Sequence, residues 1–110
     1  MTKRSKDKDR EAPGKLVEVL RALSDPVRLE IVRQLSVEGD KACSSFGIDM
    51  PKSSLSHHFR VLRQTGIIAF EHQGTVIMNR LRSEDLNEQF PGLLTSVLAA
   101  AKSDIKGQRS

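Results

Sequence analysis

The chain of 110 residues is long enough for one domain and too short for a second core of ordinary size. Hydrophobic residues make up 37 % of it and include no Trp or Tyr, which predicts a modest core that is completed by pairing with a second copy. The single cysteine, Cys43, excludes an internal disulfide framework and a zinc site built from several thiolates. No apolar run is long enough for a membrane span or a secretory signal, so a cytoplasmic protein is expected.

The formal net charge of +4 is compatible with nucleic-acid binding but is unevenly placed. The excess of Lys and Arg lies near the two ends of the chain, whereas residues 16–101 carry slightly more acids than cations. Within this central part there is no acid between positions 50 and 70. The local placement of charge, and not the global value, therefore favours a nucleic-acid-binding surface.

The composition divides the chain into three parts. Residues 1–14 are polar, charge-dense and end in Pro-Gly, which predicts a disordered basic arm. Residues 15–104 hold the periodic apolar pattern of one folded domain, and residues 105–110 are predicted to form a flexible tail.

The first half of the domain is predicted to be helical. Apolar residues at helical spacing predict a first helix over 16–23, which Ser24-Asp25-Pro26 ends while capping a second helix that runs to about residue 35. Arg28 lies within the apolar arc of this helix, so its head is expected to reach an acid or a phosphate. A short helix is expected over 42–46, before a tight turn.

A longer helix over 52–64 follows and ends at Gly66. Two β-rich runs, 67–70 and 75–78, flank His72-Gln73-Gly74, which predicts a β-hairpin turn. Ser83 is expected to cap another helix start, and the final helix begins again at Pro91. The predicted class is mainly α with a small β-hairpin, in the order α-α-α-α-β-β-α, which is a winged helix-turn-helix.

The helix over 52–64 divides by face. Leu55, His58, Phe59 and Leu62 recur at helical spacing and are expected to face the core. The opposite face and its flanks carry cations, hydroxyls, an imidazole and an amide, the groups that bind phosphates and read base edges in the major groove. The alternative is an ordinary solvated helix face. The candidate DNA-binding residues are Lys52, Ser53, Ser54, Ser56, His57, Arg60, Arg63 and Gln64.

Two stretches, Leu23-Ser24-Asp25-Pro26-Val27-Arg28 and Ser53 to Ile68 with its Ser56-His57-His58-Phe59 run, resemble the arsenic-repressor-like (ArsR/SmtB) winged-helix regulators. The resemblance covers about residues 16–101. It implies a homodimeric DNA-binding transcriptional regulator, usually a repressor, with the helix over 53–64 as recognition helix. It also implies a wing tip at His72, Gln73, Gly74 and Thr75. This tip holds no Lys or Arg, so the wing is expected to position the protein and not to grip the DNA.

Metal-sensing relatives carry a Cys-x-Cys pair before the recognition helix, or His and acidic ligands along the last helix. Here the first place offers only Cys43 and the last helix has no His and only Asp104. Zinc generally needs about four ligands, so no metal site and no cofactor is expected. Cys43 itself has two interpretations: a thiol sensor beside the recognition helix, or a small side chain that packs the short helix.

The apolar stripes of the first and last helices lie at opposite ends of the chain, and a winged helix-turn-helix core does not need both. We expect them to form a homodimer interface, although they could instead close one monomeric core. No catalytic residues are expected, because there is no Gly-rich phosphate loop and no nucleophile with an evident base. The main alternative function is a winged helix used only for protein–protein contact. The interface residues are Leu16, Val19, Leu20, Leu23, Leu93, Leu94, Val97 and Leu98.

Overall fold

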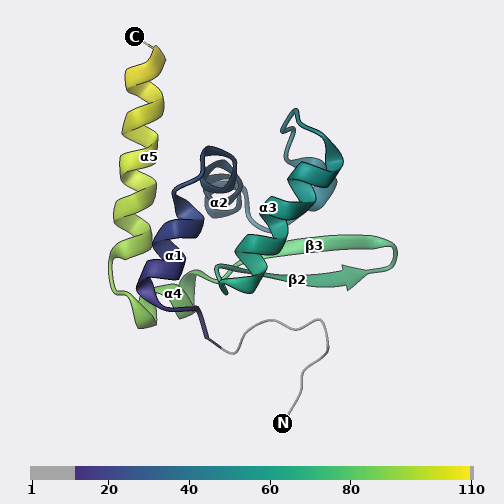
Figure 1. Cartoon of the computed structure of the whole chain (residues 1–110), viewed down its shortest axis with the longest axis horizontal. Coiled ribbons are helices and arrows are strands. Elements are labelled where there is room, and N and C mark those ends of the chain that lie inside the picture. Colours follow the sequence, from purple (N-terminus) through teal and green to yellow (C-terminus); the bar gives the residue numbers. More distant parts are fainter. Residues whose placement is uncertain (1–11, 110) are drawn as a thin grey trace.

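The computed structural model describes residues 12–109, with side chains described as far as Asp104. It has the predicted architecture of a helical body from which a β-hairpin projects (Figure 1). None of the helices in this range is long and apolar enough to cross a bilayer. In chain order the elements are α1 (Leu16–Leu23), α2 (Pro26–Glu38), β1 (Lys41–Ala42), the 3-10 turn η1 (Cys43–Ser45), α3 (Lys52–Gln64), β2 (Ile68–Gln73), β3 (Val76–Leu81), α4 (Ser83–Gln89) and α5 (Leu93–Arg109).

The junction of α1 and α2 is the predicted one. The carboxylate of Asp25 accepts hydrogen bonds from the backbone N–H groups of Val27 (2.9 Å) and Arg28 (3.0 Å). Pro26 occupies the first turn, where its missing N–H costs nothing. This cap fixes the start of α2, the helix on which α1 and α3 both pack.

The hydrophobic core lies between the three N-terminal helices and the base of the hairpin. Its centre is formed by Ile31 and Val32 of α2 and by Leu62 of α3, all fully buried. Phe46 packs edge-on against Phe59, with the ring centroids 5.3 Å apart. The recognition-helix candidate α3 is thus held on a rigid scaffold by its apolar face.

The sheet has three antiparallel strands in the order β1-β3-β2, one more than the sequence predicted. The extra strand, β1, pairs Lys41 with Asn79 and Ala42 with Met78, and only a 3-10 turn follows it where a short helix over 42–46 was expected. The buried Asn79 side chain donates to the Lys41 carbonyl oxygen at 3.3 Å. Pairing with a distant strand therefore overrides the local helical preference of this segment.

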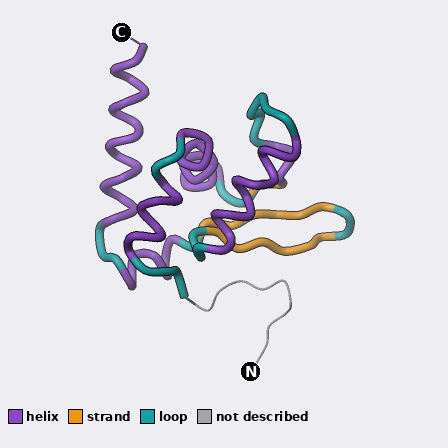
Figure 2. Tube along the Cα trace, in the orientation of Figure 1, coloured by secondary structure: helices purple, strands orange, loops and turns teal. Residues whose placement is uncertain are grey.

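The hairpin is also longer than predicted, and its turn lies further along the chain. His72 pairs with Ile77 and Gln73 with Val76, so both belong to β2 and not to the turn. Only Gly74 and Thr75 connect the strands, and Gly74 has φ of +67°. A glycine at the first position of a two-residue turn matches the twist of the flanking strands, which explains the tighter hairpin. Figure 2 shows the two strands in orange, extending away from the helices.

Two predictions near the C-terminus differ from the structure. Arg82, not Ser83, stands at the N-cap of α4, and no side chain caps this helix. The last helix begins at Leu93 and not at Pro91, because Pro91 and Gly92 form the turn before it. It then continues to Arg109.

The predicted N-terminal arm is described only from residue 12 onward; residues 1–11 lie outside the described part. Residues 13 and 14, expected to belong to the arm, are buried against the domain. The Gly14 N–H donates to the Thr65 carbonyl oxygen at 2.9 Å, and the Gln89 amide donates to the carbonyl oxygens of Pro13 (3.2 Å) and Gly14 (3.0 Å). A Cβ on Gly66 would lie 2.7 Å from Cα of Pro13, so only glycine allows this approach. The segment thus closes the C-terminal end of α3.

Candidate nucleic-acid interface

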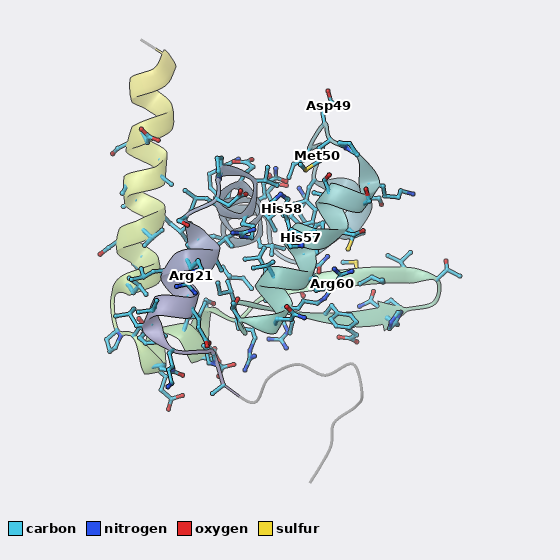
Figure 3. All side chains as sticks on the ribbon, in the orientation of Figure 1. Arg21, Asp49, Met50, His57, His58 and Arg60 are labelled. Atoms are coloured by element: carbon cyan, nitrogen blue, oxygen red, sulfur yellow. The ribbon has the colours of Figure 1, made fainter. Side chains whose placement is uncertain are left out.

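The two faces of α3 separate as the sequence predicted. Phe59 and Leu62 are buried, and Leu55 and His58 are half-buried. His57 and Arg60 are exposed on the same helix (Figure 3). Of the eight candidate DNA-binding residues, Ser54 and Arg63 are half-buried and the others are exposed: Lys52, Ser53, Ser56, His57, Arg60 and Gln64. The structure therefore brings most of the proposed set together on one solvent-facing, acid-free surface.

A polar network joins α3 to the α1–α2 junction. Arg28 donates through Nε to the Ala22 carbonyl oxygen at 2.7 Å, and one terminal nitrogen lies 3.1 Å from Nδ1 of His58. The same ring nitrogen lies 3.6 Å from the Asp25 carboxylate. Burial raises the pKa of Asp25, but the backbone N–H of Arg28 and the charges of His58 and Arg28 outweigh it, so the pKa lies below its ordinary value. The structure places the Arg28 guanidinium against a carbonyl oxygen and an imidazole, close enough to Asp25 for its charge to act on that carboxylate.

A second polar network, which the sequence analysis missed, supports α3 from the side of η1. The Gln34 amide is buried and donates to the Phe46 carbonyl oxygen (3.0 Å) and to Glu30 (2.8 Å), while Lys41 donates to Gln34 at 2.6 Å. Hydrogen bonds from Arg33 hold the pKa of Glu30 below its ordinary value, although burial acts in the opposite direction. A glutamine on the inner face of α2 is the one sequence signal for this network.

The wing tip is exposed at all four predicted residues, His72, Gln73, Gly74 and Thr75. The exposed Glu71 precedes them. No Lys or Arg lies between positions 71 and 76, so the tip presents backbone and neutral polar groups with one carboxylate. This surface can lie beside a DNA backbone but offers no strong phosphate clamp.

Cys43 is half-buried and packs against the core. Its sulfur accepts a hydrogen bond from Nδ2 of the buried Asn79 at 3.2 Å. Among the described residues, no three His, Cys, Asp or Glu side chains gather in a group that could hold a metal ion.

The eight residues predicted for a dimer interface fall into three groups. Val19 and Leu23 are buried in the core of the single chain. Leu16 and Leu20 are 44 % and 42 % exposed, beside Val17 at 61 %. The four residues of α5 are half-buried: Leu93, Leu94, Val97 and Leu98.

Comparisons with known proteins agree with this geometry. The family model described as "Bacterial regulatory protein, arsR family" matches residues 25–69, which run from the cap of α2 into β2. The uncharacterized HTH-type transcriptional regulator YceK of Bacillus subtilis is 31 % identical over 73 % of this chain and 83 % of its own length. The chain belongs to the arsR family. As a member of this family, it is a DNA-binding transcriptional regulator.

Two further comparisons place this arsR-family protein among its relatives. The cadmium resistance transcriptional regulatory protein CadC homolog of Staphylococcus aureus is 29 % identical over 76 % of this chain and 70 % of its own length. The solved structure of an ArsR-like transcriptional regulator from Rhodococcus sp. RHA1 superposes with a TM-score of 0.61 at 25 % identity, covering 86 % of this chain and 87 % of that one. The winged helix-turn-helix fold of this family member is thereby confirmed.

Proposed function

We propose that this arsR-family protein represses transcription by binding an imperfectly palindromic DNA operator as a homodimer, with α3 in the major groove. The observation that carries the proposal is the acid-free exposed face of α3. Lys52 and Arg60 on this face have the charge to neutralise phosphates, and Ser56 and His57 have the hydrogen-bonding groups to read base edges. The buried face of the same helix fixes the backbone that carries these groups to the domain.

The surface of α1 supports the dimer. Leu16, Val17 and Leu20 expose apolar side chains on a short helix that lies beside α5 (Figure 1). Contiguous exposed apolar residues on a small domain are typical of a protein–protein interface, and a second copy of the chain supplies the same apolar surface. A two-fold axis would place two α3 helices about one helical turn of DNA apart, which predicts a palindromic target.

The test is selection of bound fragments from a genomic DNA pool, followed by affinity measurements on an enriched fragment at several salt concentrations. We expect the logarithm of affinity to fall linearly with the logarithm of salt. Replacing Lys52 and Arg60 by Ala should reduce the slope by about two, since each neutralised phosphate contributes about 0.9. Lys102→Ala, which removes an exposed charge from α5 on the other side of the molecule from the hairpin, is the matched control and should leave the slope unchanged (Figure 1).

Two results would contradict the proposal. An unchanged slope in the Lys52 and Arg60 double variant would mean that α3 is not the phosphate-binding helix. A pool from which no fragment is enriched would favour the alternative, a winged helix that contacts only protein.

A further inference from the structure

Arg63 differs from the other cations of α3. Its guanidinium carbon lies 4.5 Å from the ring centroid of Phe70, and its side chain is half-buried, whereas Lys52 and Arg60 are exposed. Arg63 occupies the last turn of α3, and Phe70 lies in β2, the first strand of the hairpin. This contact therefore joins the recognition helix to the wing.

Phe70 also contacts His72, which lies two residues further along the same strand. Its ring packs edge-on against the ring of His72, with the centroids 5.8 Å apart and the planes at 75°. Ile68, Phe70 and His72 alternate along β2 and so share one face of the strand, on which burial falls steadily from complete at Ile68 to exposed at His72. Phe70 lies midway, with part of its ring left outside the core.

We propose that Phe70 is a positioning residue for DNA binding: it holds the Arg63 guanidinium ready for a phosphate before the DNA arrives. Stacking uses the flat face of the guanidinium and leaves its N–H edge available for hydrogen bonds to oxygen. A free arginine side chain must be ordered when it binds a phosphate, and this ordering reduces the affinity by about twofold to tenfold. The contact with Phe70 removes most of that loss, because the side chain is already ordered.

This inference rests on the proposed function, since it takes α3 as the phosphate-binding helix. It adds Phe70 to the residues that determine the affinity for DNA, although its side chain offers no hydrogen bond to DNA. Its effect passes through Arg63, so the two residues must be coupled.

A double-mutant cycle tests the coupling. We expect Phe70→Leu to weaken binding to an enriched fragment by about twofold to tenfold, with the salt slope unchanged because the charge is kept. Arg63→Ala should weaken binding and also lower the slope by about one. In the Arg63→Ala background, Phe70→Leu should have no further effect. Phe70→Tyr keeps the aromatic face and should bind DNA with the affinity of the natural chain.

Several outcomes would overturn the inference. If Phe70→Leu weakens binding equally with and without Arg63, Phe70 acts through the shape of the hairpin alone. An unchanged slope in Arg63→Ala would show that Arg63 does not neutralise a phosphate. Melting temperatures measured for the natural chain and for each variant separate unfolding from a loss of affinity. Arg60→Ala separates failure of this inference from failure of the proposed function. If Arg60→Ala and Arg63→Ala both leave the affinity for DNA unchanged, the proposed function itself fails.

Discussion

A guanidinium nitrogen of Arg28 lies 3.1 Å from Nδ1 of His58, a ring that is carried by α3. Arginine can only donate, so this contact is a hydrogen bond when Nδ1 of the neutral ring carries its lone pair. The Asp25 carboxylate stands 3.6 Å from the same nitrogen. One atom of His58 thus faces the cap of α2 and a cation of α2 together, which ties the orientation of α3 to the start of α2.

Arg28→Ala should destabilise the fold. The substitution removes the donor to the Ala22 carbonyl oxygen and to His58, and leaving such half-buried groups unpaired costs about 1–3 kcal/mol. Urea unfolding measures the change in free energy. The control is Arg60→Ala on the exposed face of α3, for which a change within about 0.5 kcal/mol is expected. Equal stability of the two variants would contradict a structural role for Arg28.

The charge of Asp25 should make stability depend on pH under acidic conditions. Because the pKa of Asp25 is lower in the folded chain than its ordinary value, its contribution is complete above the unfolded pKa of about 3.9 and is lost as the pH falls through the folded pKa. Asp25→Asn keeps a capping side chain but cannot titrate. Unfolding free energies measured from pH 6 to about 2 should therefore fall less steeply for this variant. Parallel curves would show that Asp25 contributes nothing to the acid sensitivity.

Replacing both Leu16 and Leu20 by Glu should dissociate the proposed dimer. These side chains are exposed in the single chain, so the charges are expected to block association without unfolding α1. Sedimentation equilibrium reports the mass, and circular dichroism reports whether the helices remain. Val37→Glu on α2 is the matched control, because Val37 is 71 % exposed and lies outside the proposed interface. A double variant that stays dimeric would place the interface elsewhere.

Cys43→Ser should leave both stability and DNA binding nearly unchanged. The serine oxygen can accept the hydrogen bond from Asn79, and the change in unfolding free energy should stay within about 1 kcal/mol. We expect hydrogen peroxide to have no effect on DNA affinity in either protein. Release of DNA by peroxide from the natural chain, but not from Cys43→Ser, would instead support the thiol-sensor interpretation.

Local signals made most of the helical body predictable from the sequence. The cap at Asp25 depends on residues within one turn, and the two faces of α3 depend on a spacing of three and four residues. The glycine after α3 marked its end. These features need no knowledge of where the rest of the chain lies.

Contacts between distant segments were not predictable in the same way. The strand β1 forms because Lys41 pairs with Asn79, and the local sequence around either residue does not predict this pairing. The position of Arg63 was predicted from its helix face, but its contact with Phe70 follows from how the hairpin folds back on α3. Periodicity predicted an apolar face at Val19 and Leu23 but not that the rest of the single chain covers both residues.

Gly66 has two functions in the fold, because its Cα carries a hydrogen atom where other residues carry a side chain. At this place the glycine ends α3 with φ of +78° and leaves room for the backbone of residue 13, so adding one methyl group at position 66 would disturb both. It would also separate Gly14 from the Thr65 carbonyl and from Gln89, the last residue of α4. A shortened version of the protein that starts at Lys15 would have the same defect without any mutation. Residues 13 and 14 therefore belong to the folded domain and secure the C-terminal ends of α3 and α4.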